Sequence, residues 1–238
     1  MTTHGTLYLI PVTLGDNDIA KALPSGSIKV AQALDTFIVE NEKTARRFLS
    51  AIGIARPVRE LTLLTLNEHT KPDELTALIA PLLEGKDVGL ISEAGCPGIA
   101  DPGAQVAALA HCQNIRVVPL VGPSSILLAI MASGLNGQRF AFLGYLPSDK
   151  TARVQHLKEI EKASQQHNET QVFIETPYRN QHLLKDILAT CRPNTRLCVA
   201  CDLTLESESI HTQPIRQWKA GHLPDLHKRP TVFLLLAD

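Results

Sequence analysis

The sequence predicts an α/β protein of two domains, residues 1–121 and 122–238, with a ligand-binding cleft between them. Strand-like apolar runs alternate with helical patterns nearly throughout the 238 residues. The alternation starts afresh after Gly122-Pro123, and no linker rich in Gly or Ser interrupts it. We therefore place the domain boundary near Val121–Ser124. A cleft between two such domains is where small-molecule sites prefer to lie.

In the first domain, short apolar runs closed by Pro, Gly or Asp predict strands. These runs are Thr6–Pro11, Thr36–Glu40, Asp87–Ile91 and Ile115–Leu120. The last run is apolar on both faces, as is typical of a central strand in a parallel sheet. The segments between them predict helices at Ser27–Leu34, Thr44–Ile52, Thr70–Gly85 and Val106–Cys112. In the third helix, Leu75, Leu78, Ile79 and Leu82 share one face.

The second domain repeats the pattern. Helices are predicted at Ile126–Ser133, Thr151–His167 and Arg179–Cys191, and strands at Phe140–Gly144, Gln171–Glu175, Arg196–Cys201 and Thr231–Ala237. The spacing of Cys198 and Cys201 is that of a metal or redox pair, but residues three apart on a strand point to opposite faces. Since no second pair is present, we predict no metal site.

Composition excludes several classes of protein. Hydrophobic residues make up 44% of the chain and charged residues 20%, both ordinary values for a folded soluble domain. A net charge of −1 excludes a global cationic field, so a nucleic-acid partner would have to contact a local patch. No apolar run approaches the ~20 residues of a membrane span. The lack of an export signal and the five unpatterned cysteines predict a cytoplasmic protein.

The most unusual segment is Ser92–Gly103, SEAGCPGIADPG, directly after the predicted strand that ends at Ile91. Ligands of open α/β sheets bind beyond the carboxyl ends of the strands. Glycine permits a close approach of the backbone to a ligand, and proline fixes the loop in advance. We expect this glycine-rich loop to bind a ligand; the alternative is a long connection built from turn residues.

Three further segments follow predicted strands. Pro11–Asp16 follows the first strand, and Val121–Ser125 follows the strand before the boundary. Ser124 or Ser125 can cap the next helix, whose N-terminal amide groups favour a polar or anionic ligand, although capping alone also explains both serines. In the second domain, the segment ETPYR at 175–179 presents a carboxylate, a hydroxyl and a guanidinium. Its alternative is a helix start with solvated charges.

Five segments carry a family resemblance: GTLYLIPVTLGD at 5–16, ISEAGCPGIADPG at 91–103, VVPLVGPSS at 117–125, FAFLGYLP at 140–147 and FIETPYR at 173–179. In this order they resemble the tetrapyrrole-methylase superfamily, whose members transfer a methyl group from S-adenosylmethionine (SAM). Within it the chain is most similar to the ribosomal RNA small subunit methyltransferase I group. The likeness covers essentially the whole chain and implies a tetrapyrrole-methylase-like fold.

The resemblance implies that SAM lies folded in the cleft, bound without a metal, and that the protein is a homodimer. The ligand-binding positions of the family match Pro11, Ser92, Glu93, Ala94, Gly95, Ser124, Ser125, Glu175, Pro230 and Thr231. Strand-end reasoning reaches the loops of the first domain independently. It does not reach Pro230 or Thr231, which rest on the resemblance alone.

The same resemblance implies a ribose 2′-hydroxyl of small-subunit ribosomal RNA as the methyl acceptor. Local basic clusters that would hold phosphates are Lys43-Arg46-Arg47, Lys150-Arg153-Lys158 and Lys228-Arg229. Glu93 and Glu175 are the candidate carboxylates for accepting the hydroxyl proton, with no role assigned to either. A tetrapyrrole carbon, another small molecule or a protein side chain is the alternative acceptor. A tetrapyrrole would need converging Arg and Lys, and the identified loops offer only Arg179.

Overall fold

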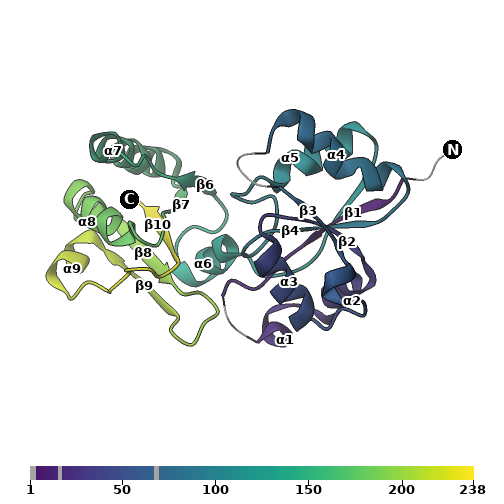
Figure 1. The fold of residues 1–238 in the computed structure, drawn as a ribbon. Helices are drawn as coiled ribbons and strands as arrows, with labels where there is room; N and C mark the ends of the chain where they lie inside the picture. Colours follow the sequence, from purple (N-terminus) through teal and green to yellow (C-terminus); the bar gives the residue numbers. More distant parts are fainter. Residues whose placement is uncertain (1–3, 16–17, 67–69) are drawn as a thin grey trace. The chain divides into compact units, whose positions relative to one another are not determined.

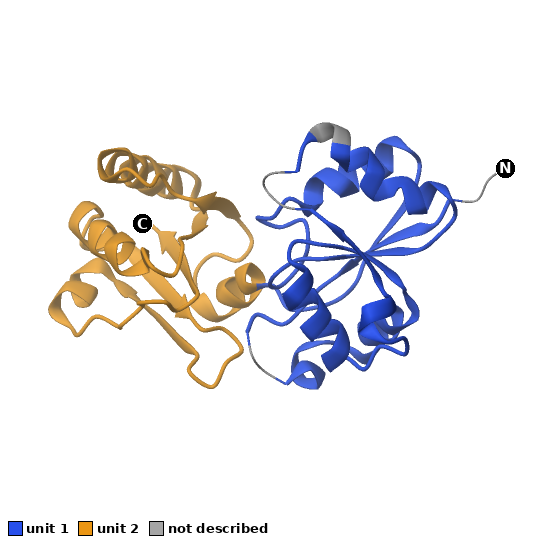
Figure 2. Cartoon of the chain, in the orientation of Figure 1, with its two compact units in different colours: residues 1–124 blue, residues 125–238 orange. Residues whose placement is uncertain are grey.

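The computed structural model describes residues 4–15, 18–66 and 70–238, drawn as a ribbon in Figure 1. The chain divides into two compact units, residues 1–124 and 125–238 (Figure 2). The sequence places the boundary after Val121, and the division falls after Ser124. Each unit has its own sheet covered by helices, which confirms the α/β fold class. Asp16, the last residue of the predicted first loop, lies outside the described residues.

Unit 1 is built on a five-stranded parallel sheet in the order β3-β2-β4-β1-β5. Its strands are β1 (Thr6–Ile10), β2 (Thr36–Val39), β3 (Thr62–Thr65), β4 (Val88–Ile91) and β5 (Arg116–Pro119). Figure 1 shows α4 (Pro72–Leu83) and α5 (Gly103–Cys112) on one face of the sheet. The other face carries α1 (Ile19–Ala22), α2 (Ser25–Ala33) and α3 (Glu42–Ala51), and a 3₁₀ turn at Val58–Glu60 precedes β3.

Side-chain alternation along the strands divides the core of unit 1 into two layers. Leu7, Ile38 and Leu90 pack with α4 and α5, whereas Ile10 and Phe37 pack toward α2 and α3. Both sets are almost fully buried. Burial on both faces explains why the sequence predicts β1, β2 and β4 from continuous apolar runs.

The predicted central position of Ile115–Leu120 is wrong. This segment forms β5, which pairs only with β1 and is the edge strand of the sheet. Arg116 and Pro119 are exposed, so the strand does not need two apolar faces. Proline has no N–H to donate to a second neighbour, and it is therefore confined to edge strands. Pro119 therefore indicates an edge strand, although the apolar pattern of the segment suggests a central one.

The opposite edge strand, β3, is absent from the sequence prediction. Thr62 and Thr65 are exposed and the two leucines between them are only half-buried. The strand therefore lacks the buried run that identifies its neighbours. A four-residue strand with a polar residue at each end carries too weak a pattern to separate it from a loop.

Unit 2 has a mixed sheet in the order β6-β7-β10-β8-β9, parallel only between β6 and β7. Its strands are β6 (Phe140–Tyr145), β7 (Thr170–Ile174), β8 (Arg196–Cys201), β9 (Ser209–Pro214) and β10 (Thr231–Leu236). In Figure 1, α7 (Lys150–His167), α8 (Asn180–Thr190) and α9 (Ile215–Ala220) cover one face. The other face is packed against α6 (Ser125–Ser133). The polar edge strand β9 and the short α9 are absent from the sequence prediction.

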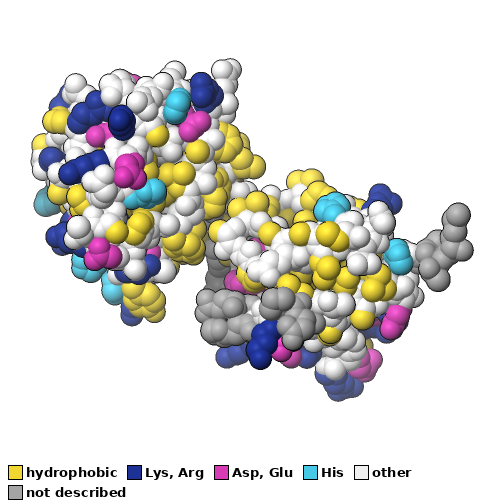
Figure 3. All heavy atoms as spheres, turned by 90° about the horizontal axis from the view of Figure 1, so that it is seen from above, with side chains coloured by type: hydrophobic (Ala, Val, Ile, Leu, Met, Phe, Trp, Pro, Cys, Tyr) yellow, Lys and Arg dark blue, Asp and Glu magenta, His cyan; other side chains and the backbone are white. Residues whose placement is uncertain are grey.

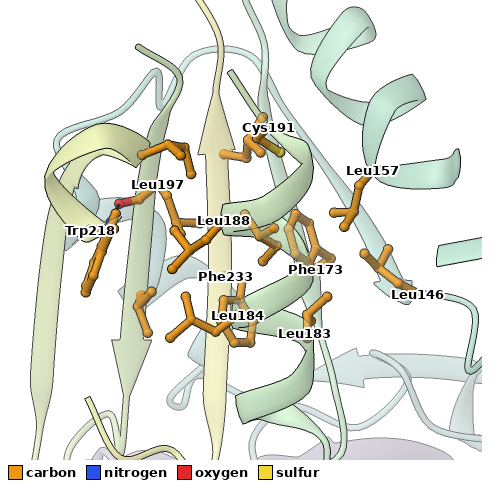
Figure 4. Packing of buried hydrophobic residues seen from close by; sticks show 14 of the residues in the cluster. Leu146, Leu157, Phe173, Leu183, Leu184, Leu188, Cys191, Leu197, Trp218 and Phe233 are labelled. Carbon is orange, nitrogen blue, oxygen red and sulfur yellow. Dashed lines mark hydrogen bonds between the residues drawn. The ribbon is translucent and has the colours of Figure 1, made fainter. Parts of the chain in front are cut away.

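The main core of unit 2 lies between the sheet and α7, α8 and α9 (Figure 4). Phe173 of β7 and Phe233 of β10 stack with ring centroids 6.0 Å apart, and Leu184 of α8 packs in the same cluster. Trp218 of α9 donates its indole N–H to the carbonyl of Leu197 at 3.0 Å. A buried tryptophan with its donor satisfied is a packing residue.

The two cysteines of β8 do not form a pair. Cys201 belongs to the cluster under α7 and α8, together with Leu197 and Val199, whereas Cys198 alternates with them along the strand. Both cysteines are buried and free. Burial raises the pKa of both thiols. They are therefore packing residues on opposite faces of the sheet.

Candidate ligand-binding site

Three loops of unit 1 meet at the carboxyl ends of β4, β1 and β5, which are neighbours in the sheet. Pro11 follows β1, Ser92 follows β4 and Gly122 lies beyond β5. The first two loops are joined because the N–H of Val12 donates to the carbonyl of Gly95 at 2.9 Å. A β carbon on Gly122 would lie 2.3 Å from the β carbon of Pro11. Only glycine therefore allows the first and third loops to pack this closely.

The glycine-rich loop is fixed from within. The carboxylate of Asp101 accepts the N–H of Gly98 at 2.9 Å and the N–H of Gly103 at 2.7 Å. Gly95 has a φ of +71° and Gly98 a φ of +82°, a region that residues with side chains rarely adopt. The loop is thus held in one conformation by its own residues. A binding loop needs such a fixed conformation, whereas a flexible connecting loop does not.

Carboxylates tie the start of this loop to α3. Glu40, which follows β2, accepts the N–H of Glu93 at 3.2 Å. Thr44 in the first turn of α3 donates its hydroxyl to the carboxylate of Glu93. Burial raises the pKa of Glu40, and the nearby carboxylates of Asp101 and Glu93 raise it further, against the lowering effect of the Glu93 N–H. This end of the sheet therefore concentrates negative charge.

A cavity of about 420 Å³ lies between α3 and the loops after β1 and β4. The loops contribute Val12–Gly15, Ser92 and Glu93, and the remaining walls include Ile19 and Ile91. Thr44, Arg47, Phe48 and Ala51 of α3 also line it. Their spacing of three, four and seven residues places them on one face of the helix. Ser92 and Glu93 thus belong both to the predicted SAM-binding set and to the wall of this cavity.

In unit 2, Glu175 lies directly after β7 and is almost completely buried, with 1% of its side chain exposed. Its carboxylate accepts the N–H of Thr176 at 2.6 Å and pairs with Arg179 at 2.7 Å. The alternative of a solvated Glu175 is therefore wrong. Because its Oε1 already accepts two hydrogen bonds, Glu175 acts first as the anchor of the turn that starts α8.

The segment before β10 is joined to the segment after β7. The side-chain amide of Asn180 donates to the carbonyl of Arg229 at 2.7 Å, and the N–H of Lys228 donates to the carbonyl of Pro177 at 3.1 Å. Arg229 in turn pairs with Asp202 at 2.8 Å. Pro230 and Thr231, predicted from the resemblance alone, thus lie in a segment that is bonded to the Glu175 turn.

Two buried polar atoms in this part of unit 2 lack a hydrogen-bond partner within the described residues. They are Oδ1 of Asn180 and Nε of Arg179. Asn180 is fully buried, so an unpaired carbonyl there is costly unless a ligand or water satisfies it.

The ten predicted site residues thus form two groups. Pro11 and Ser92–Gly95 share the carboxyl edge of the first sheet, and Ser124 follows Pro123, whose carbonyl lies 3.3 Å from Sγ of Cys96. Ser125 opens α6 in unit 2, and Glu175, Pro230 and Thr231 are grouped by the contacts described above. That the two groups face one cleft remains a prediction.

The sequence interpretation misses the residues of α3 that line the cavity. Its reading of Thr44–Ile52 as a helix is correct, but it weighs Arg46 and Arg47 only as members of a basic cluster. The spacing of Thr44, Arg47, Phe48 and Ala51 was available as a signal. It mixes polar and apolar residues, so hydrophobic periodicity alone does not select it.

Each of the three basic clusters predicted to hold phosphates contains one arginine that is already in an ion pair. Arg153 is buried and donates to Asp186 at 2.6 Å, Arg46 pairs with Glu42, and Arg229 pairs with Asp202. On the face shown in Figure 3, Lys and Arg side chains are interspersed with Asp and Glu. The cluster Lys150-Arg153-Lys158 is therefore wrong as a set, because its central residue bridges α7 and α8.

Among the described residues, no group of three or more His, Cys, Asp or Glu is placed to hold a metal ion. No helix among residues 4–15, 18–66 and 70–238 is long and apolar enough to cross a membrane.

Comparison with known protein families identifies the family of the chain. Residues 6–218 match the family described as tetrapyrrole (corrin/porphyrin) methylases. The chain is 31% identical over 237 residues to the ribosomal RNA small subunit methyltransferase I of Escherichia coli O157:H7, covering 99% of this chain and 78% of that protein. It is 32% identical over 239 residues to the protein of the same name from Xylella fastidiosa, covering 100% and 83%. Both relatives confirm the resemblance inferred from the ordered segments.

Solved structures of the same fold are more distant in sequence. The methyltransferase CobJ superposes with a TM-score of 0.64 at 19% identity, covering 98% of this chain and 94% of that one. Diphthine synthase superposes with a TM-score of 0.70 at 14% identity, covering 98% and 90%. At these identities the likeness concerns the fold alone, and it confirms the tetrapyrrole-methylase-like architecture.

Proposed function

The chain belongs to the tetrapyrrole (corrin/porphyrin) methylase family and is a SAM-dependent methyltransferase, and from this premise we propose that it methylates ribosomal RNA of the small subunit. The observation that carries the acceptor is the identity of about one third, over nearly the whole chain, to proteins named ribosomal RNA small subunit methyltransferase I. A tetrapyrrole would need converging basic side chains for its carboxylates. Of the arginines at the Glu175 turn, Arg179 is already paired with Glu175 and Arg229 with Asp202.

We propose that SAM contacts the two groups of loop residues described above. In unit 1 these are Pro11, Ser92, Glu93, Ala94, Gly95 and Ser124, and in unit 2 Ser125, Glu175, Pro230 and Thr231. The glycine-rich loop supports this proposal with a backbone that Asp101 fixes and that has positive φ angles at Gly95 and Gly98. SAM supplies an electrophilic methyl group on a sulfonium and requires no metal to activate it.

The finer proposal is methylation of a ribose 2′-hydroxyl. The hydroxyl oxygen bonds to the methyl carbon while its proton leaves, so the protein must hold donor and acceptor at attack distance and offer a path for the proton. Glu93 suits the proton better than Glu175, because Glu93 is exposed and lines the cavity whereas Glu175 is buried in an ion pair. Because the proposed acceptor is ribosomal RNA, we propose that the protein acts in the cytoplasm.

Two measurements test this function. Isothermal titration should detect binding of SAM and of its demethylated product. If neither gives a heat of binding at millimolar concentration, SAM is not the methyl donor. Labelled SAM should then transfer its methyl group to small subunits from a strain deleted for the gene, with one ribose becoming resistant to alkaline cleavage. If the protein binds SAM but no label appears in subunits, free RNA or assembling particles, ribosomal RNA is not the acceptor.

We also propose a homodimer, which rests on the likeness to the family alone. The expected result of sedimentation at micromolar concentration is a species of twice the chain mass. A single species of monomer mass would contradict it.

A further inference from the structure

The cavity of unit 1 combines three kinds of lining. Leu14, Ile19 and Phe48 give it an apolar wall that includes an aromatic ring. Arg47 adds a guanidinium, and Glu93 adds a carboxylate whose position is fixed by Thr44. The cavity opens to solvent, and its lining residues Thr44, Arg47 and Glu93 are exposed, so a ligand in solution can reach all three kinds of lining.

Each lining group matches one part of a nucleotide. A flat nucleobase fits an apolar wall that carries an aromatic ring, a ribose hydroxyl donates to a carboxylate, and a phosphate pairs with a guanidinium. The volume of 420 Å³ falls within the range of small-molecule sites, about 300–1,000 Å³.

The cavity also lies where an acceptor must be. Ser92 and Glu93 line it and belong to the residues proposed to contact SAM. Methyl transfer requires the acceptor atom within contact distance of the methyl group, so the acceptor pocket must share a wall with the donor site. The glycine-rich loop, fixed by Asp101 and tied to α3 through Thr44, is that shared wall.

We propose that this cavity binds a single unpaired nucleotide of the RNA acceptor, with its base against Phe48, its ribose toward Glu93 and a phosphate on Arg47. The inference rests on the proposed function, and it adds where and how the acceptor is held. A nucleotide reaches such a pocket only when it is unstacked from its neighbours, as enzymes that modify nucleotides require. The protein therefore selects a site that can be extruded from the RNA.

Filling the cavity is the first test. Ala51→Trp adds a large ring from an exposed position of α3 that lines the cavity. Ala33→Trp is the matched control, since Ala33 is an exposed residue of α2 that lines a separate cavity containing Tyr8 and Lys86. Ala51→Trp should lower kcat/KM for RNA about 100-fold, while the dissociation constant of SAM changes less than about twofold. Ala33→Trp should change neither.

The charge of Arg47 is the second test and does not depend on packing. Arg47→Ala should raise the KM for RNA about 10- to 100-fold. It should also make the slope of log affinity against log salt less negative by about 0.7, the value for one phosphate of single-stranded RNA. Lys29→Ala, which removes a charge from the wall of the other cavity, should leave both quantities unchanged.

The outcomes separate the cavity from the function. If the unmodified protein binds SAM but transfers no methyl to RNA, the proposed function is wrong and the nucleotide pocket falls with it. If transfer occurs and Ala51→Trp behaves like Ala33→Trp, the pocket alone is wrong. If Ala51→Trp abolishes SAM binding while the protein keeps its melting temperature, the cavity belongs to the donor, and the proposal is again overturned.

Discussion

The two halves of the proposed donor site are built by different physical means. In unit 1 carboxylates fix the glycine-rich loop internally, but the three loops are joined to one another by close backbone contacts: Val12 bonds to Gly95, and Gly122 packs directly on Pro11. In unit 2 the segments around Glu175 and Arg229 are held by charged side chains, two of them buried. A backbone-built site is sensitive to added volume, whereas a charge-built site is sensitive to lost charge. Substitutions chosen by that rule test the comparison.

Added volume should have the largest effect. Gly122→Val places a β carbon 2.3 Å from Pro11, so one of the two loops must move. We expect the free energy of unfolding to fall by about 3 kcal/mol, at the upper end of overpacking costs, and SAM affinity to fall below detection. Thermal unfolding and titration with SAM measure the two effects.

Gly26→Ala is the matched control for this prediction. Gly26 lies in α2, and a β carbon there would meet no atom within 4 Å. We expect a gain of about 0.5–1 kcal/mol from the better helix propensity of alanine, with unchanged SAM binding. If Gly122→Val and Gly26→Ala lost equal amounts of stability and SAM affinity, the close packing of Gly122 on Pro11 would not explain the need for glycine.

Lost charge in unit 2 should be asymmetric. Arg179→Met leaves the buried carboxylate of Glu175 unpaired, whereas Glu175→Gln leaves a guanidinium that is 41% exposed and can be solvated. We expect the first variant to lose about 2–3 kcal/mol and the second about 1 kcal/mol. The double variant should be more stable than Arg179→Met alone. Chemical denaturation checks this order, and additive losses would contradict the pairing.

The neighbouring pair of Asp202 and Arg229 should contribute less, because 7% of its carboxylate side chain is exposed, against 1% for Glu175. The carboxylate of Asp202 accepts from Arg229 and from the hydroxyl of Ser207, both at 2.8 Å, and the bond to Asp202 raises the pKa of Arg229. Because 30% of the Arg229 side chain is exposed, we expect Asp202→Asn to lose only about 1 kcal/mol. Denaturation in low and high salt should show the loss shrinking as salt rises. A loss independent of salt would indicate a packing role.

The smallest effect should come from Glu40, a carboxylate of unit 1 whose pKa is raised. Since folding raises the pKa of Glu40, its contribution to stability is fully present below the unfolded pKa of 4.5 and is lost as pH rises through the folded pKa. Glu40→Gln removes this titration and can still accept the Glu93 N–H. We therefore expect the variant to gain stability over the native protein at pH 7, by less than about 1 kcal/mol, and to lose the gain at pH 4. A gain of equal size at both values would contradict this.

The sequence predicts those parts of the fold where burial is continuous. The strands β1, β2 and β4 are apolar on both faces and follow directly from the sequence. The edge strands β3 and β9 are partly exposed and polar, so nothing in the local pattern separates them from loops. The order of strands in a sheet is a tertiary property, which is why β5 was expected at the centre although Pro119 indicates an edge.

The candidate site was predictable to the extent that its signal is local. Ser92–Gly103 stands out because glycine and proline report backbone geometry, and the structure places positive φ angles at Gly95 and Gly98. Pro230 and Thr231 have no such signal, since antiparallel pairing of β10 with β7 is what brings them to Glu175. The α3 face of the cavity depends on where α3 packs, and no periodicity within one helix encodes that.

The place of β10 in the sheet has a consequence for synthesis on the ribosome. The sheet of unit 1 is complete once Pro119 has emerged, but in unit 2 the last strand, β10, lies between β7 and β8. Until it is made, unit 2 consists of the separate pairs β6-β7 and β8-β9, with their inner edges open. The end of β10 follows the end of β7 by about 60 residues, so at about 5–20 residues per second these edges stay open for on the order of 3–12 s. During that interval a folded first unit is tethered to exposed strand edges, which makes these nascent edges the natural binding site for a chaperone.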